Sequence, residues 1–356
     1  KQPQEGPPAV MGVMEHVGIE HVAQLVVIQK GGIIFMDIEY LLWLQNFRIS
    51  IKDAWTPFME WISLFAVRGL YFLPAFVYWY VKKRDGLYML ASLSVSLLVN
   101  AVIKLTACVY RPWVRDTRII PAGDAIKTAG GYSFPSGHTM TATPIYGSFA
   151  VLAKKAGHIW VSVVCMALIL LTMFSRNYLG VHTPQDVVVG LLASLLVLWG
   201  TAKIFRYLDA HPESENLFLL LGFLAGAAAI AYIRLKSYPV DYVDGKIIVK
   251  PESMLPSSTS DISLIFGLVI GRYVEKRWVK FSPDWSLSPS LAALKGLILC
   301  AVGLWIYSFI IYTVKGYLVK TLGAFQGRML YGFTNTFFVV AVWPAVMKLF
   351  CRKNQT

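Results

Sequence analysis

Long apolar runs of about 20 residues, separated by short polar joints, dominate this chain of 356 residues. An α-helix of that length crosses the hydrocarbon core of a bilayer. Such runs should be helical, because lipid cannot hydrogen-bond to backbone N–H and C=O groups. Only 15% of the residues are charged and 56% are hydrophobic, and the mean hydropathy is +0.57. These values exclude an ordinary soluble domain and predict an all-α, polytopic membrane helical bundle.

We expect about nine spans, of which one at 261–275 is weak because its apolar stretch is short and ends in Arg272. In the first span, Glu60 and Arg68 are eight positions apart on one helical face, so they can pair inside the bundle. No internal repeat or linker separates a second folded domain. The eight clear spans are predicted at 57–81, 87–107, 137–153, 158–174, 184–205, 216–233, 292–314 and 329–349.

The region before the first span has two parts. We interpret residues 1–35 as an extension, with a cloning origin as one interpretation and Met36 as a plausible native start. Residues 36–56 mix apolar and polar side chains and include Trp43 and Trp55. They predict an amphipathic interfacial helix on the membrane surface, anchored by the tryptophans. A helix packed on the protein's own rim is the alternative interpretation.

The net charge of +13 comes from basic residues that sit in the joints between apolar runs. This placement suits anionic headgroups or a phosphorylated substrate, and no basic nucleic-acid-binding module is visible. The dense joints at 82–84, 154–155 and 276–277 are short and lie on one side of the nine-span arrangement. The positive-inside rule makes that side cytoplasmic. The four cysteines are scattered and indicate neither a disulfide framework nor a zinc site.

Three polar clusters stand at the ends of apolar runs, and the predicted topology brings them to one membrane level, on the outer side. Ionisable groups are costly near hydrocarbon, so their meeting at one level indicates a function. Positive donors arranged in this way can surround the oxygens of a phosphoryl group. The clusters are Lys104 with Arg111-Pro112, Pro135-Ser136-Gly137-His138, and Ser175-Arg176 with His182 and Asp186.

Each cluster also has a simpler structural interpretation. A basic residue at a helix end commonly snorkels or neutralises the helix dipole. Ser136 can be a plain N-cap before Gly137, or it can donate to an anion held by the exposed N–H groups of the helix start. Asp186, three residues after an N-cap at Thr183, can be a simple cap. It also lies four residues from His182, where it can hold one ring N–H and leave the other nitrogen free to attack phosphorus.

In type and spacing these residues match all three signature motifs of the type 2 phosphatidic acid phosphatase superfamily, which includes lipid phosphate phosphatases, glucose-6-phosphatase and vanadium haloperoxidases. The chain resembles this superfamily over roughly residues 60–205. The resemblance implies a six-helix phosphatase core, which we assign to 57–210, and additional C-terminal spanning helices at 211–356 that complete the bundle.

The resemblance also implies the role of each residue. His182 would attack phosphorus and form a phosphohistidine, Asp186 would orient it, and His138 would protonate the leaving oxygen. The phosphate would be bound by Lys104, Arg111, Ser136, Gly137 and Arg176. No cofactor or metal is expected, since no Asp, Glu and His cluster is arranged to hold magnesium or zinc.

The expected function is hydrolysis of a lipid phosphate or pyrophosphate: phosphatidic acid, phosphatidylglycerol phosphate, a polyprenyl pyrophosphate or a sphingoid phosphate. The alternatives are a sugar-phosphate phosphatase of the glucose-6-phosphatase type, a phosphotransferase, and a non-catalytic transporter or lipid-binding protein. The expected partners are the lipid substrate and the bilayer, without nucleic acid. We expect a bacterial inner (plasma) membrane, with the active site on the outer (periplasmic or extracellular) face.

Overall fold

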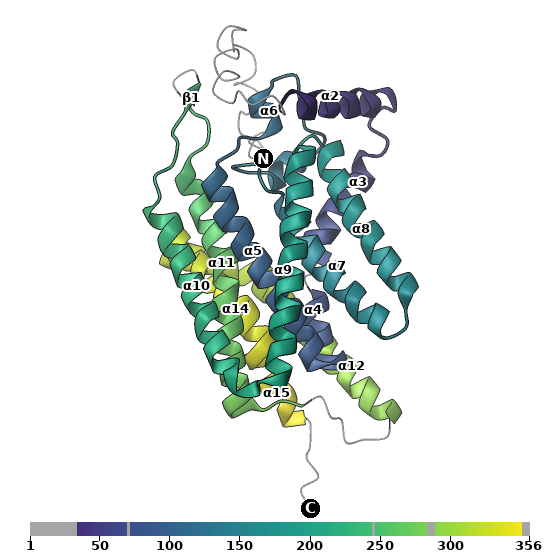
Figure 1. Cartoon of the computed structure of the whole chain (residues 1–356), viewed down its shortest axis with the longest axis vertical. Coiled ribbons are helices and arrows are strands. Elements are labelled where there is room, and N and C mark those ends of the chain that lie inside the picture. Colours follow the sequence, from purple (N-terminus) through teal and green to yellow (C-terminus); the bar gives the residue numbers. More distant parts are fainter. Residues whose placement is uncertain (1–33, 70–71, 244–245, 283–288, 351–356) are drawn as a thin grey trace, which may run out of the picture.

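The computed structural model describes residues 34–69, 72–243, 246–282 and 289–350, which form one bundle of long helices (Figure 1). All but the last two residues of the expected extension at 1–35 lie outside the described residues.

Helix α2 (Ile34–Ser50) lies across one end of the bundle, roughly at right angles to the long helices (Figure 1). Its Ile38 and Leu41 are buried against Ile119 of the loop that follows α5. Arg48 donates from Nη2 to the carbonyl of Ile120 at 2.8 Å. Trp43, on the other side, is 62% exposed. The helix therefore packs on the rim of the protein, and its contact with the membrane surface stays a prediction.

The first expected span is a bent pair of helical segments whose two parts are inclined by 41°. The predicted pair between Glu60 and Arg68 is wrong: within the described ranges no ion pair joins them, and Glu60 accepts from the backbone N–H of Asp124 at 2.5 Å. Glu60 and Arg68 still lie on one helical face, as predicted, because both line the same cavity with Ser63 and Leu64. The segments are α3 (Thr56–Leu64), η2 (Phe65–Gly69), α4 (Leu73–Phe76) and η4 (Val77–Val81).

Helix α5 (Lys83–Ala107) runs through the middle of the bundle (Figure 1). It packs against α7 (Gly137–Lys155) and α9 (Pro184–Ala210), and α8 (Ile159–Tyr178) packs on α7 as an antiparallel partner. The helices of the predicted core therefore follow the expected spans closely. The loop between α5 and α7 contains α6 (Pro112–Arg115) and the short 3-10 turn η5 (Ala125–Thr128).

The C-terminal helices stack on the other side of α5, and α11 is their centre. Glycines let α11 and α14 approach closely: a Cβ atom at Gly267 would lie 2.1 Å from the carbonyl oxygen of Phe333. The strands β1 and β2 form an antiparallel hairpin between α10 and α11, with Tyr242 opposite Ile247. The elements are η6 (Pro212–Ser214), α10 (Glu215–Leu235), β1 (Tyr242–Val243), β2 (Lys246–Ile247), α11 (Pro251–Val274), η7 (Glu275–Val279), α12 (Pro289–Phe309), η8 (Ile310–Val314), α13 (Lys315–Leu322), α14 (Ala324–Phe337), η9 (Phe338–Val342) and α15 (Trp343–Phe350).

Seven helical segments of the described chain are long and apolar enough to cross a membrane, and the bent pair makes up to eight. Helix α7 is not among them, because threonine, serine and glycine lower its hydropathy. The segment predicted as weak at 261–275 belongs to a continuous helix of 29 residues, Pro251–Val279. The prediction of an all-α, polytopic membrane bundle is confirmed, with the small β1–β2 hairpin as an addition.

Candidate active site

The turn between α8 and α9 places His182 in the interior, where its side chain is 1% exposed. Its Nδ1 lies 3.1 Å from Oδ2 of Asp186, and its Nε2 lies 3.0 Å from Nη1 of Arg111. A guanidinium group can only donate, so Nε2 must accept. The ring proton is therefore on Nδ1 and is donated to Asp186. This tautomer leaves a lone pair on Nε2, the nitrogen on the side of Arg111.

Burial and the charge of Arg111 lower the pKa of His182 well below its usual value, while the hydrogen bond and the charge of Asp186 act in the opposite direction. Burial is the largest of these causes. The ring is therefore neutral at neutral pH. A neutral imidazole is the form that can act as a nucleophile.

Asp186 caps the helix and holds the imidazole at the same time. Its backbone N–H donates to Oγ1 of the N-cap Thr183 at 3.4 Å, and its Oδ2 accepts from the N–H of Thr183 at 2.9 Å. The same Oδ2 accepts from the hydroxyl of Ser133 and from Nδ1 of His182. The predicted capping box is confirmed. The two interpretations of Asp186 are therefore compatible, because one carboxylate oxygen serves both.

Arg111 links the loop before α7 to the turn that carries His182 through hydrogen bonds. Its Nε and Nη2 donate to the carbonyls of Gly131 and Gly130 at 3.2 and 3.1 Å. Its Nη1 donates to the carbonyl of Val181 at 2.9 Å, and to Nε2 of His182. These hydrogen bonds fix the guanidinium group beside the imidazole, and no carboxylate among the described residues pairs with it.

Lys104 holds the backbone of the loop that leads into α7. Its Nζ donates to the carbonyls of Pro135 at 2.6 Å, Ser133 at 3.0 Å and Tyr132 at 3.4 Å. An ammonium group has three protons, and here three carbonyls accept from it. Lys104 therefore stabilises the loop that leads into α7 and, through this loop, the start of the helix.

Ser136, Gly137 and His138 form the start of α7. Ser136 is the N-cap and its Oγ accepts from the N–H of Thr139 at 3.4 Å, as in the simpler interpretation. A Cβ atom at Gly137 would meet only Asn100 Oδ1 at 3.7 Å, so protein packing alone does not require glycine there. His138 Nε2 is buried and has no hydrogen-bond partner within the described chain. The charges of Arg176, Arg111 and Lys104 all act on the His138 ring, so the three clusters lie together.

Arg176 is a buried cation with N–H donors that remain open, that is, without a hydrogen-bond acceptor among the described residues. Its side chain is 1% exposed, and its Nη1 donates to Ser63 Oγ at 2.6 Å. In the part of the chain that the structure describes, its Nε and Nη2 have no partner. Arg176 lines a cavity of about 260 Å³ together with the cations Arg68 and Lys127 and the carboxylates Glu60 and Asp124. A buried guanidinium group with free donors facing a cavity is suited to binding phosphate oxygens.

Four residues that contribute to this arrangement were missed in the sequence. Ser133 and Asn177 each stand beside a predicted motif: Ser133 binds Asp186, and Asn177 Nδ2 donates to the carbonyl of His182 at 2.8 Å. Their short distance from the motifs was a usable signal. Ser63 and Lys127 come from other segments, so no spacing pointed to them. In the described ranges, no three His, Cys, Asp or Glu side chains are grouped as metal ligands.

Comparison with known proteins decides the family. A family model for the PAP2 superfamily matches residues 85–210, the range that carries all three polar clusters. Phosphatidylglycerophosphatase B of Bacillus subtilis is 31% identical over 157 residues, which cover 41% of this chain and 72% of that protein. The chain belongs to the PAP2 superfamily. The resemblance to the type 2 phosphatidic acid phosphatases is therefore confirmed, and this PAP2 protein is a multi-pass membrane phosphatase.

Two more relatives are similar over different lengths. Glucose-6-phosphatase catalytic subunit 1 of Haplochromis nubilus is 27% identical over 233 residues, 55% of this chain and 65% of that protein. Undecaprenyl-diphosphatase of Sulfolobus acidocaldarius is 27% identical over 136 residues, 38% of this chain and 58% of that protein. The chain thus covers less than two thirds of either protein. No solved structure gives a significant match.

Proposed function

We propose that this phosphatase hydrolyses a lipid phosphate or pyrophosphate through a phosphohistidine formed on His182. The observation that carries the proposal is the neutral imidazole of His182, with its proton on the side of Asp186 and its lone pair on the side of Arg111. A histidine held by a carboxylate in this way is oriented for nucleophilic attack. The buried cations beside it supply the positive charge that phosphoryl transfer requires.

In the first step, Nε2 of His182 forms a bond to phosphorus while the bond from phosphorus to the leaving oxygen breaks. His138 enters this step as the imidazolium, which the negative charge of the bound phosphate favours, and it donates a proton to that oxygen. The product leaves as an alcohol from a phosphomonoester, or as a lipid monophosphate from a pyrophosphate. The phosphate oxygens accept from the open donors of Arg176, from the N–H groups around Gly137 and from Arg111, whose Nη1 exchanges its imidazole partner for a phosphate oxygen. Lys104 acts indirectly by holding the loop.

In the second step, a water molecule attacks the phosphohistidine. His138, now neutral, takes a proton from the water as the new P–O bond forms and the N–P bond breaks. Inorganic phosphate leaves and His182 returns to its starting tautomer. Arginines stabilise the charge in both steps, so we expect activity to persist in EDTA. A complete loss in EDTA that added metal restores would contradict a metal-independent mechanism.

The relatives and the membrane setting support a lipid substrate. By their names, two relatives act on phosphatidylglycerophosphate and on undecaprenyl diphosphate. We propose that a headgroup of this kind, or that of phosphatidic acid or a sphingoid phosphate, reaches the site while its apolar tail stays in lipid. The short basic joints at 82–84 and 154–155 support an outward-facing site. We propose a bacterial inner membrane as its setting.

A soluble sugar phosphate is the second candidate. The similarity to the glucose-6-phosphatase subunit extends over 55% of this chain, further than the match to either lipid phosphatase. If the site accepts glucose 6-phosphate, turnover should not depend on an apolar tail.

The test is a phosphate-release panel in detergent micelles with phosphatidic acid, phosphatidylglycerol phosphate, a polyprenyl pyrophosphate and glucose 6-phosphate. We expect release from at least one lipid, and none from His182→Ala. The exposed His211 lies outside the site, so His211→Ala is the matched control. Enzyme quenched with denaturant at alkaline pH should carry labelled phosphate that is stable in base and labile in acid. Release from glucose 6-phosphate alone, or full activity of His182→Ala, would contradict the proposal.

A further inference from the structure

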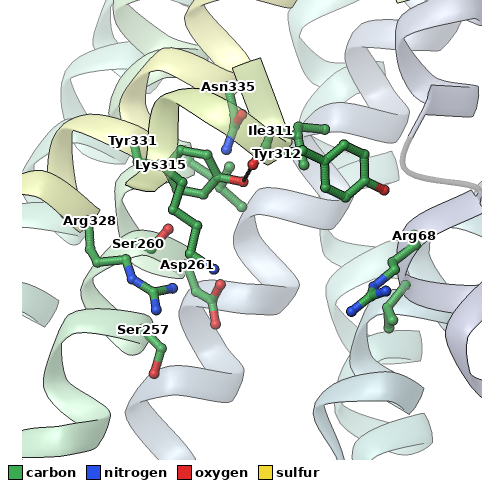
Figure 2. A pocket seen from close by; sticks show the side chains of 12 residues that line it. Arg68, Ser257, Ser260, Asp261, Ile311, Tyr312, Lys315, Arg328, Tyr331 and Asn335 are labelled. Atoms are coloured by element: carbon green, nitrogen blue, oxygen red, sulfur yellow. Dashed lines mark hydrogen bonds between the residues drawn. The ribbon is translucent and has the colours of Figure 1, made fainter. Parts of the chain in front are cut away.

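A second charged cavity lies among the C-terminal helices, lined by residues of η2, α11, the η8–α13 segment and α14 (Figure 2). Its volume is about 340 Å³. Figure 2 shows Asp261, Lys315 and Arg328 around one space, with Arg68 on its other side. None of these residues belongs to the three sequence motifs.

The charges in this cavity do not balance. Arg68, Lys315 and Arg328 are cations, and Asp261 is the carboxylate among the lining residues, so two positive charges remain. Within the described residues, none of the four forms an ion pair or a hydrogen bond with another side chain. Unpaired charges inside a membrane bundle are costly and mark sites of function. The excess of positive charge fits an anion.

The cavity also offers polar atoms for groups other than an anion. Asn335 is 3% exposed, and its Oδ1 has no hydrogen-bond partner within the described chain. The hydroxyl of Tyr331 donates to the carbonyl of Ile311 at 3.1 Å, which fixes the ring at the cavity wall (Figure 2). Carbonyl and carboxylate oxygens accept from hydroxyl groups. Asn335 and Asp261 therefore suit a ligand that carries hydroxyls beside its phosphate.

This cavity adjoins the active site. Arg68 lines both this cavity and the one that Arg176 faces. Asp261 and Lys104 lie close enough for their charges to interact. Tyr312, which also lines the cavity, is 59% exposed, so the cavity opens at the surface of the bundle. A ligand could therefore reach it from the membrane and extend towards His182.

We propose that this cavity binds a second phosphate of the substrate, which rests on the proposed function at His182. The ligand would be a lipid headgroup with two phosphates separated by a polyol such as glycerol. Its terminal phosphomonoester would lie at His182 and its phosphodiester among Arg68, Lys315 and Arg328. The two phosphates of a pyrophosphate share an oxygen, so both would remain at the catalytic cations. The cavity thus selects for a phosphatidylglycerol phosphate type of headgroup over phosphatidic acid.

The experiment compares phosphatidylglycerol phosphate with phosphatidic acid in micelles, using the double variant Lys315→Gln/Arg328→Gln. We expect kcat/KM for phosphatidylglycerol phosphate to fall at least about tenfold, mainly through KM, because two charge-assisted contacts are lost. Activity on phosphatidic acid should stay within about twofold, and it also reports that the variant is folded. Lys320→Gln, an exposed lysine of the same helix α13 outside the cavity, should change neither value. An equal loss on both lipids, or no loss on either, would overturn the proposal.

A binding measurement separates this proposal from the catalytic one. Native mass spectrometry should show phosphatidylglycerol, a phosphodiester lipid without a phosphomonoester, retained by the wild type and lost from the double variant. If binding is lost in the variant but neither lipid is hydrolysed by the wild type, the anion site stands and the proposed function fails. Equal retention by both proteins would refute the anion site.

Discussion

Buried charges occur at both ends of the bundle, but they are paired at one end and partly unpaired at the other. Away from the active site, Glu275 is completely buried and contacts Lys83, Arg272 and the backbone N–H of Phe281. Arg272 also binds Glu215 at 2.8 Å. At the active site, Arg176 is as deeply buried, yet two of its nitrogens have no partner within the described residues.

The difference separates structure from function. A buried carboxylate surrounded by cations and N–H groups leaves little for a ligand to gain, and its role is to hold helices together. Buried cations without a carboxylate leave their attraction available to an anion. Substitutions at the first end should therefore alter stability, whereas substitutions at the second should alter catalysis. Each of the following predictions tests that separation.

The largest effect is expected for His182→Ala. Loss of the nucleophile should lower kcat by about 10⁴-fold, roughly 5.5 kcal/mol of activation free energy. The Arg176 side chain remains, so the variant should still be stabilised by inorganic vanadate, a phosphate analogue, in a thermal melt. Residual turnover above about 1% of the wild type would contradict the role of nucleophile.

Glu275→Gln should instead cost stability. Removing the charge leaves Lys83 without its carboxylate partner, although Arg272 keeps Glu215. Breaking a buried ion pair costs about 3–5 kcal/mol. Thermal unfolding in detergent should shift to a lower temperature, while kcat of the folded fraction stays unchanged. Glu213 is exposed and its ion pair with His211 spans 3.3 Å, so Glu213→Gln should shift the melt very little. A large fall in kcat of folded Glu275→Gln would contradict a purely structural role for this carboxylate.

Arg176→Gln should have the opposite signature. The open guanidinium donors are expected to contribute about 3–4 kcal/mol to the transition state, so kcat should fall about 10²- to 10³-fold. Arg176→Lys should recover only part of the loss, because an ammonium group cannot bind two oxygens in one plane. The melting temperature should not fall, since a buried unpaired charge is removed. Arg206→Gln, on an exposed position of α9, serves as the control.

The sequence allowed the prediction of features that depend on local spacing. Thr183, Asp186 and His182 lie within one turn at a helix start, so the cap and the imidazole contact followed from geometry along one segment. Long apolar runs placed the helices of the core in the same way. These features need no knowledge of how distant segments meet.

The partners that come from distant segments could not be predicted. Lys104 binds backbone carbonyls nearly 30 residues away, and Arg176 binds Ser63 across 113 residues. Glu60 binds the backbone N–H of Asp124 instead of pairing with Arg68, and no spacing marks a partner from so distant a segment. Helix α11 is continuous although 261–275 looked weak, because its polar serines and Asp261 lie inside the bundle. Tertiary packing decides these features.

The smallest predicted effect uses pH to test how the active-site end holds its histidine. Burial lowers the pKa of His182 well below 6.5 in the folded protein, whereas the unfolded chain takes up this proton near 6.5. Unfolding therefore binds a proton below that pH, and stability that is present above 6.5 is lost as the pH falls. Between pH 7.5 and 5.5 the loss should be about 1.4 kcal/mol, equivalent to a few degrees in melting temperature.

His182→Asn should lose less stability than the wild type over this pH interval, because asparagine does not titrate. His211→Asn, at an exposed position, should behave like the wild type. An equal fall for wild type and His182→Asn would mean that the folded protein protonates the ring as readily as water does. The imidazole would then be a cation at mildly acidic pH and would lose the lone pair on Nε2. The active site would hold one more positive charge instead of a nucleophile.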